Sequence, residues 1–343
     1  MAQRLLVNSS PHYRSGETTK TVMSDVVIAM LPILVGAVIF FGFRALTLTL
    51  VSVGACLAFE TLFCKIAKKK NTIFDGSAIV TGMLLAFNLP VAVPYWLAVV
   101  GAFFAIVVVK MLFGGLGKNI VNPALAARAF LFSWPTLMTT YVKPFVSPAL
   151  PIFSDPIFTN GGQVSDYIDS ISTATPLKAL KAGVLSDVDV MDMFIGNTGG
   201  CIGEVSAALI LLGGIYLLCR KVITWHIPVT YIGTVALVTF IFPLTGGHFD
   251  FEFMLQSLFS GGLFLAAFFM ATDYTTSPAT PKGRVIFGIC CGLLTVFLRY
   301  YSGYPEGASY SILLMNMLVL PLDRLTKPRR YGIGGGYHVE SGK

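Results

Sequence analysis

The stretch VMSDVVIAMLPILVGAVIFFG at residues 22–42 decides the class of fold. It holds a single charged residue, Asp25, and about 20 residues are enough to cross the ~30 Å hydrocarbon core of a bilayer as a helix. The preceding residues lack an apolar core followed by a small-residue cleavage site, so we expect no cleaved signal peptide. This first apolar run is therefore predicted to direct membrane insertion itself.

The composition extends this prediction to the whole chain. The 343 residues are 55% hydrophobic and 12% charged, and their mean hydropathy is +0.76, whereas soluble proteins carry about 25% charged residues. The apolar residues are spread along the full length, which excludes a soluble domain with one anchor. The sequence predicts an all-α polytopic membrane protein.

We count ten apolar segments and expect each to be a transmembrane helix. They are residues 22–42, 45–64, 77–91, 94–112, 122–138, 201–218, 225–243, 253–272, 284–300 and 307–322. With both termini in the cytoplasm, ten spans place most of the 24 Lys and Arg residues on the cytoplasmic side, as the positive-inside rule requires. The basic residues expected outside are Arg44, Lys143, Lys178, Lys181 and Arg299.

This topology divides a single membrane domain, residues 1–343, into five parts. They are a cytoplasmic N-terminal segment (1–21), a first helix group (22–138), a long external loop (139–200), a second helix group (201–322) and a basic cytoplasmic tail (323–343). The third and fifth segments are short and contain Gly, Asn and Pro, which is typical of broken helices that line a buried site. Similarity between residues 93–108 and 227–242 suggests two related halves, although chance similarity between apolar helices explains it equally well.

A polar turn, DSISTATPLKAL at residues 169–180, stands out in the predicted external loop. Pro176 disfavours helical geometry at Thr175 and suits the first position of a helix. Thr175 is therefore predicted to cap a helix that begins at Pro176. A phosphate group attached to its hydroxyl would lie at the positive end of that helix, near Lys178 and Lys181. An ordinary capped surface helix is the alternative.

Residues 169–175, DSISTAT, resemble the D-x-x-[ST]-G-A-T acceptor pattern for covalent flavin attachment, with Thr173 in place of the usual Gly. Other stretches resemble the family of RnfD, from the Rnf ion-translocating electron-transport complex, and of its homologue NqrB, from the Na⁺-translocating NADH:quinone reductase. They are DGSAIVTGMLLAFNLP (75–90), FGGLGKNIVNPALAARAF (113–130), FFMATDYTTSPATPKG (268–283) and residues 300–332. The resemblance runs from about residue 10 to residue 332. NqrB usually has a longer N-terminal extension, so RnfD is the better match.

The resemblance implies a flavoprotein with a ten-helix fold of two related halves. FMN would be bound covalently, as a phosphodiester of Thr175, which makes the chain a phosphoprotein. A flavin transferase would transfer it from FAD after recognising Asp169 and Ser172. A second, non-covalent flavin, riboflavin, is implied near Asn119 and Asn122, for which simple capping of a broken helix is the alternative.

The resemblance also implies a place in the prokaryotic cell (inner) membrane beside the other Rnf proteins, namely RnfA, RnfB, RnfC, RnfE and RnfG. That complex couples electron transfer between reduced ferredoxin and NAD⁺ to the movement of Na⁺ or H⁺, and its ferredoxin and NADH sites belong to other subunits. This chain would hold flavin and relay electrons. It would have no catalytic residues, no metal and no turnover of its own.

Several charged residues lie inside apolar segments or at their ends, where an ionisable side chain is costly and is by default a functional candidate. They are Glu60, Arg128, Glu204, Asp273 and Glu306. Glu60 is expected to pair with Lys65 or to reach the interface. Glu204 and Glu306 are expected in the first turns of helices. Arg128 is expected to contact either a flavin phosphate or a carboxylate.

The remaining conspicuous residues have simple expected roles. The six cysteines form no CxxC pair and are expected to be small apolar residues, with a shared iron–sulfur centre at Cys290 and Cys291 as the alternative. Trp96, Trp134 and Trp225 are expected at the membrane interfaces. The basic tail would face anionic lipid or a cytoplasmic partner, and nucleic acid is not implied.

Two other functions remain open at this point. One is that of NqrB in the quinone reductase. The other, from a different class, is a solute channel or transporter with two repeated halves and broken helices. Such a transporter has no need of the flavin-acceptor turn and is expected to be colourless.

Overall fold

Helices account for the regular structure of the described residues, apart from isolated β-bridges, of which one joins Pro90 to Cys201. The computed structural model describes residues 18–69, 72–145, 175–204, 206–246, 249–303 and 306–327. The first helix group contains α1 (Thr19–Phe41), α2 (Phe43–Ile66), the 3-10 turn η1 (Ile73–Asp75), α3 (Ser77–Phe87), α4 (Tyr95–Phe103), the π-helix η2 (Phe104–Met111), α5 (Pro123–Leu131) and α6 (Pro135–Met138).

Two short helices and a second helix group follow. The short helices are α8 (Pro176–Lys181) and α9 (Val190–Ile195). The second group contains α10 (Ala207–Cys219), α11 (His226–Ile241), α12 (Phe251–Phe259), α13 (Leu263–Leu265), the π-helix η4 (Ala266–Met270), α14 (Pro281–Tyr301), α15 (Ala308–Met317) and α16 (Val319–Leu325). Each of the ten predicted segments falls on helical structure. Residues 146–174 of the predicted external loop and most of the N-terminal segment and of the tail lie outside the described residues.

Among the described residues, three helices are long and apolar enough to cross a membrane, namely α1, α2 and α14 with 23, 24 and 21 residues. The combined stretch of α12, α13 and η4 passes the same test but bends by 64° at its break. Four apolar helical stretches are shorter: α3, α4 with η2, α10, and α11. The chain is thus a multi-pass membrane protein whose described residues are mostly helical, while ten complete spans remain a prediction.

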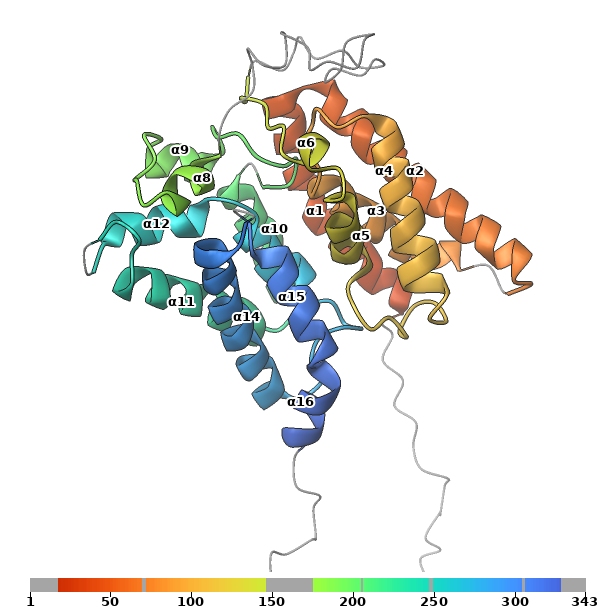
Figure 1. Ribbon diagram of the computed structural model, residues 1–343. Coiled ribbons are helices and arrows are strands. Elements are labelled where there is room, and N and C mark those ends of the chain that lie inside the picture. The colour runs from red at the N-terminus through yellow and green to blue at the C-terminus, as the bar shows by residue number, and fades with distance from the viewer. Residues whose placement is uncertain are drawn as a thin grey trace, which may run out of the picture.

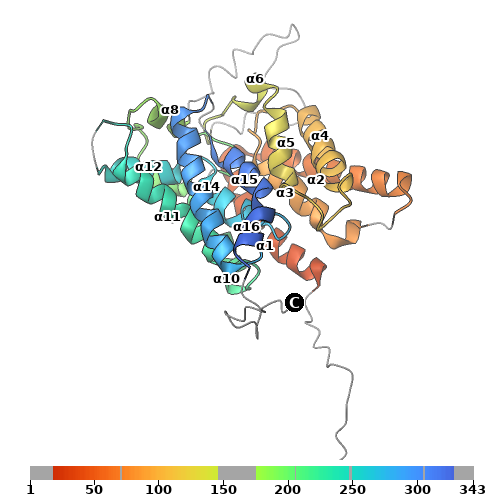
Figure 2. The same cartoon turned by 60° about the horizontal axis from the view of Figure 1, so that its bottom comes forward.

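The two helix groups lie side by side in both views (Figures 1 and 2), with α1 packed along α10. Helices α8 and α9 pack against α12 (Figure 1). The groups are also joined through their backbones. The N–H groups of Ile202 and Gly203 donate to the carbonyls of Leu89 and Phe87, at 3.0 and 2.9 Å. The end of α3 is therefore completed by a strand-like segment of the second group.

Two breaks in the helices are stabilised by buried arginines. Residues 88–94 between α3 and α4 are buried and not helical, so their carbonyls need partners inside the protein. Arg44 supplies them, because its guanidinium donates to the carbonyls of Val91 and Val93 at 3.0 and 3.2 Å. Arg299 does the same for the break after α12, where it donates to the carbonyls of Ser257 and Ser260 at 2.6 and 3.2 Å.

Arg44 and Arg299 were expected on the outer side by the count of positive charges. They are instead only 1% and 4% exposed. The count treats every arginine as a solvated charge, whereas these two are held by backbone oxygens that a broken helix leaves unpaired. The predicted broken helices themselves are confirmed.

We expect Gly213→Ala to destabilise the protein, because Gly213 lies where α10 meets α1. A methyl group at this position would overlap the carbonyl oxygen of Ala29, so the backbone of α1 would have to move. Overpacking of this kind costs about 1–3 kcal/mol. The measurement is the apparent Tm of the purified protein in detergent.

Gly233→Ala on α11 is the matched control for this prediction. No atom lies within 4 Å of an added methyl group there, and alanine favours a helix over glycine by roughly 0.5–1 kcal/mol. The control is expected to keep or slightly raise the Tm. Equal Tm values for the two variants would show that α1 and α10 are not packed this closely.

Candidate functional site

A cavity of about 70 Å³ lies between the two helix groups and contains Asn119 and Asn122; we call it the asparagine pocket. Its walls come from α1, α3, η2 and the start of α5 on one side, and from the end of α10 and the residues around η4 on the other. The polar residues that line it include Ser77, Thr81, Lys110, Asn119, Asn122 and Asp273. The structure therefore brings together residues that are far apart in the sequence.

The two asparagines differ in how they are bonded. Asn122 caps α5, since its Oδ1 accepts from the N–H of Ala124 at 3.0 Å, and its Nδ2 donates to the carbonyl of Met270 at 3.3 Å. The Oδ1 of Asn119 is buried and has no hydrogen-bond partner in the described part of the protein. A buried acceptor without a donor is costly, so Asn119 fits a ligand that brings an N–H or O–H group.

A buried ion pair forms part of the wall of this pocket. The Nζ of Lys110 lies 2.7 Å from Oε2 of Glu60 and 2.8 Å from Oγ of Ser77. The other carboxylate oxygen of Glu60 accepts from the hydroxyl of Thr72. Glu60 thus pairs with Lys110 rather than with Lys65, the partner expected from the sequence.

Asp273 lies on the opposite wall of the asparagine pocket. Its carboxylate accepts from the hydroxyls of Thr275 and Thr276, at 3.0 and 3.2 Å. These local hydrogen bonds are typical of a polar turn. They stabilise the connection between η4 and α14 and keep a negative charge at the wall.

A second, smaller cavity of about 20 Å³ contains Thr175; we call it the threonine pocket. Its lining includes Tyr141, Thr175, Thr198, Glu204, Ser260 and Glu306. The predicted helix start at Pro176 is confirmed, and Thr175 stands at the N-cap position with the extended geometry φ −70°, ψ 148°, but without the capping hydrogen bond expected of its side chain. The Thr175 side chain makes no capping hydrogen bond, so its hydroxyl is not committed to the helix.

The helix and the basic residues near Thr175 offer a phosphate on its hydroxyl less positive charge than the sequence suggested. Helix α8 has six residues, so its dipole is weak. Lys181 donates to the backbone carbonyl of Ser302, so at least one of its protons is already used. A different polar atom is available: the Oγ of Ser260 is buried, lines the threonine pocket and has no hydrogen-bond partner among the described residues.

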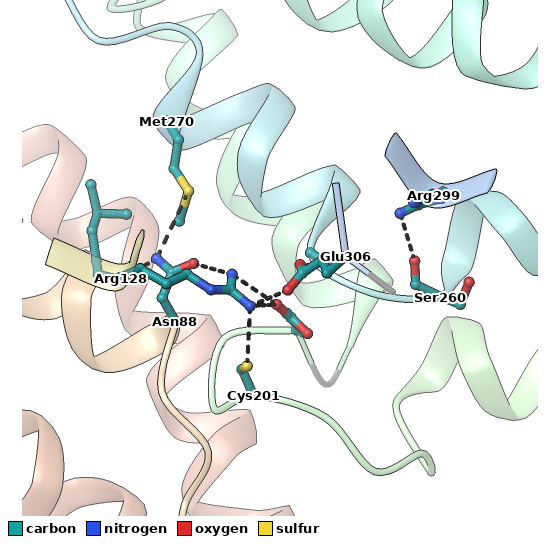
Figure 3. A network of polar contacts seen from close by, with 10 residues as sticks. Asn88, Arg128, Cys201, Ser260, Met270, Arg299 and Glu306 are labelled. Atoms are coloured by element: carbon teal, nitrogen blue, oxygen red, sulfur yellow. Dashed lines mark hydrogen bonds and ion pairs between the residues drawn. The ribbon is translucent and has the colours of Figure 1, made fainter. Parts of the chain in front are cut away.

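Arg128 connects the two helix groups (Figure 3) and contacts Glu204 and Glu306, two residues that line the threonine pocket. Its guanidinium donates to Oδ1 of Asn88 at 2.6 Å and to Glu204 at 3.4 Å, and it forms an ion pair with Glu306. The side chains of Arg128, Glu204 and Glu306 are 2%, 7% and 9% exposed. Of the two predicted partners for Arg128, the carboxylate is the one observed.

The two carboxyl groups of this cluster stand before helices rather than in their first turns. Glu204 precedes α10, and Glu306 precedes α15. Burial works against ionisation of Glu306, but the charge of Arg128, helped by the N–H of Gly262 at 3.0 Å, holds the pKa of Glu306 below its ordinary value. A single guanidinium thus serves two buried carboxyl groups, which makes the cluster sensitive to loss of that charge.

A line of polar contacts joins the two pockets. Asn122 donates to the Met270 carbonyl. Asn88 donates to the Met270 sulfur at 3.8 Å and accepts from Arg128 (Figure 3). Asn122 is the N-cap of α5 and Arg128 lies within this helix, six residues further on. This separation corresponds to about 9 Å along a helix. The two pockets are therefore neighbours across the short helix α5.

The structure places three of the five predicted flavin residues. Asn119 and Asn122 line the asparagine pocket and Thr175 lines the threonine pocket, while Asp169 and Ser172 lie outside the described residues. Sequence reasoning missed several residues of the site, namely Asn88, Lys110 and Ser260. Lys110 ends an apolar segment and was counted as an ordinary cytoplasmic lysine; its position in the last turn of that segment was the available signal.

Most of the cysteines are buried or half-buried, as expected of small apolar residues, whereas Cys219 is exposed; the membrane-interface positions of the tryptophans stay a prediction. Cys291 is buried and Cys290 half-buried, and the described residues contain no group of three His, Cys, Asp or Glu side chains that could hold a metal ion. Trp96, Trp134 and Trp225 are 48%, 36% and 57% exposed.

These features define a multi-pass helical membrane protein with one polar pocket between its two helix groups and a second between the second helix group and the residues that precede it. The chain belongs to the NQR2, RnfD, RnfE family, whose family model matches residues 6–332. The resemblance seen in the sequence motifs is thereby confirmed.

Several relatives are similar over nearly their whole length. In Acetobacterium woodii, the D subunit of the Na⁺-translocating ferredoxin:NAD⁺ oxidoreductase complex is 46% identical over 333 residues, covering 96% of both proteins. In Clostridium ljungdahlii, the D subunit of the proton-translocating ferredoxin:NAD⁺ oxidoreductase complex is 40% identical, covering 95% of this protein and 96% of the relative. In Shewanella amazonensis, the D subunit of the ion-translocating oxidoreductase complex is 38% identical, covering 96% and 98%.

Proposed function

We propose that this protein is the RnfD component of an Rnf-type complex, which couples electron transfer between reduced ferredoxin and NAD⁺ to ion transport across the membrane. The observation that carries the proposal is the hydroxyl of Thr175, which makes no capping hydrogen bond and lines a pocket beside the second helix group, in a protein similar to such a subunit over 96% of its length. Two of the relatives differ in the ion that their names give, Na⁺ in one and the proton in the other. Either ion is compatible with the family.

Thr175 is proposed to carry covalent FMN. Its hydroxyl oxygen would form a phosphodiester with the FMN phosphate of FAD, with release of AMP, through a flavin transferase that reads Asp169 and Ser172. A bound flavin accepts and donates electrons at this position. The Thr175 hydroxyl, which makes no capping hydrogen bond, and the Ser260 Oγ, which has no partner among the described residues, fit such a group. The protein would fix the attachment of the flavin and limit the access of water to it.

The asparagine pocket is proposed to hold a non-covalent flavin such as riboflavin. The unpartnered Oδ1 of Asn119 fits an N–H of the ring system, and Asn122 holds the end of α5 in place at the same wall. Aromatic side chains from η4, Phe268 and Phe269, supply an apolar surface for a flat ring. The pocket thus combines a few polar groups with an apolar wall, as cofactor sites do.

Ten spans in two related halves, with both termini in the cytoplasm, complete the proposal. In this orientation the asparagine pocket, at the start of α1, lies towards the cytoplasm, and the threonine pocket lies towards the outer face. The protein would sit in the prokaryotic cell membrane beside RnfA, RnfB, RnfC, RnfE and RnfG. It would have no turnover outside the complex.

We expect a host that lacks this protein to lose ferredoxin-dependent NAD⁺ reduction in its membranes and to regain it with the complementing gene. The loss should be nearly complete, because electron relay through the complex is broken. The measurement is NADH formation by membrane vesicles supplied with reduced ferredoxin. Loss of NADH-dependent quinone reduction instead would assign the protein to the quinone reductase, and loss of neither would favour a solute transporter.

A further inference from the structure

The ion pair between Lys110 and Glu60 is unusual because both of its charges are buried within the first helix group. The two side chains are 2% and 0% exposed. Removing two charges from water carries a large desolvation penalty, and a buried pair is often no more stabilising than apolar residues of the same size. Packing alone is therefore a weak reason for it, and an ionisable residue at membrane depth is a functional candidate.

The ammonium group faces the asparagine pocket, whereas the carboxylate lies behind it. Lys110 lines the pocket and Glu60 does not. The ammonium has three protons, and the described contacts use two of them, on Glu60 and Ser77. The third proton is available to a ligand, and Lys110 belongs to the π-helix η2, a distortion that is frequent at functional sites.

The opposite wall of the pocket carries the opposite charge. Asp273 lines the asparagine pocket from the second helix group, where the hydroxyls of Thr275 and Thr276 hold it. A ligand in the pocket would therefore lie between a positive and a negative side chain. The two charges must act on a charged ligand with opposite signs.

We propose that Lys110 stabilises negative charge on the reduced ring of a flavin in the asparagine pocket, and that Glu60 is the positioning residue that holds the ammonium at the wall. This inference depends on the non-covalent flavin proposed above. Uptake of two electrons, supplied by reduced ferredoxin through the complex, and of one proton from water leaves the ring with one negative charge. Lys110 then favours the reduced form and Asp273 opposes it.

The test is a redox titration of the non-covalent flavin in the purified complex, followed by acid extraction to measure how much of it is bound. Lys110→Met is expected to keep flavin within about twofold of the wild-type amount and to shift its midpoint potential negative, with at least a tenfold lower ratio of reduced to oxidised flavin at a fixed potential. Asp273→Asn is expected to shift the potential in the positive direction. Lys110→Arg should stay near the wild type.

Lys118→Met is the matched control, because Lys118 is an exposed lysine of the loop before α5 that does not line the pocket. The midpoint potential of the non-covalent flavin in this variant is expected to equal that in the wild type. If Lys110→Met alone does not fold, the double variant Glu60→Gln, Lys110→Met removes both buried charges and is expected to show the same negative shift.

Two failures are distinguishable. Bound flavin with an unchanged potential in Lys110→Met, or in the double variant, overturns the role of Lys110 and leaves the cofactor proposal standing. A wild-type complex from which acid releases no flavin overturns both the non-covalent flavin and the role of Lys110.

Discussion

Replacement of Thr175 by valine is expected to abolish covalent flavin attachment completely. Valine has nearly the same shape as threonine but lacks the hydroxyl oxygen that would form the phosphodiester. Helix α8 should persist, because its first residue is Pro176 and the Thr175 side chain makes no capping hydrogen bond. The measurement is in-gel flavin fluorescence after denaturing electrophoresis of protein co-expressed with its flavin transferase, together with the mass of the peptide that contains Thr175.

Thr198→Val is the matched control, since Thr198 is another threonine that lines the threonine pocket. This variant is expected to keep the fluorescent band and an FMN-sized mass increase on the Thr175 peptide. Two results would contradict the assignment: a band that persists in Thr175→Val, or a wild-type protein without a band.

The largest loss of stability is expected for Arg128→Met. This substitution leaves the buried carboxyl groups of Glu204 and Glu306 without their cation and leaves Oδ1 of Asn88 without its donor. Breaking a buried ion pair by removing one partner costs about 3–5 kcal/mol. The expected result is a markedly lower apparent Tm in detergent, or loss of the monodisperse protein in size-exclusion chromatography.

Arg220→Met tests whether burial is the cause. Arg220 pairs with Asp25 at 3.1 Å, but its side chain is 55% exposed, and such a pair is worth about 0–1 kcal/mol. Adding Glu204→Gln and Glu306→Gln to Arg128→Met should recover part of the stability, because the unpaired charges are then removed. Similar Tm values for Arg128→Met and Arg220→Met would show that the buried cluster contributes little.

The features that were predictable from the sequence are local ones. Apolar segments marked the positions of the helices, because burial in lipid or protein needs a continuous run of apolar side chains. The Thr175-Pro176 pair marked the start of α8 through the backbone preferences of two adjacent residues. Gly, Asn and Pro at the ends of the third and fifth segments marked the broken helices.

The partners of the buried charges were not predictable, because they depend on the tertiary fold. Lys110 and Glu60 are 50 residues apart, and Arg128 and Glu306 are 178 residues apart. Each charge has several candidate partners in the sequence, and only packing of the helices selects one. Burial of Arg44 and Arg299 was missed for the same reason, since their partners are carbonyls exposed by breaks in other helices.

The backbone contacts between Phe87, Leu89 and the segment at Ile202 and Gly203 have a consequence for biogenesis. The carbonyls at the end of α3 leave the ribosome long before the N–H groups that satisfy them. An unsatisfied carbonyl in lipid costs several kcal/mol, so the first helix group cannot settle in its final form while the rest of the protein is still being synthesised. After insertion by the translocon, residues 201–203 must therefore pack against the end of α3 in a late folding step, which completes the first helix group.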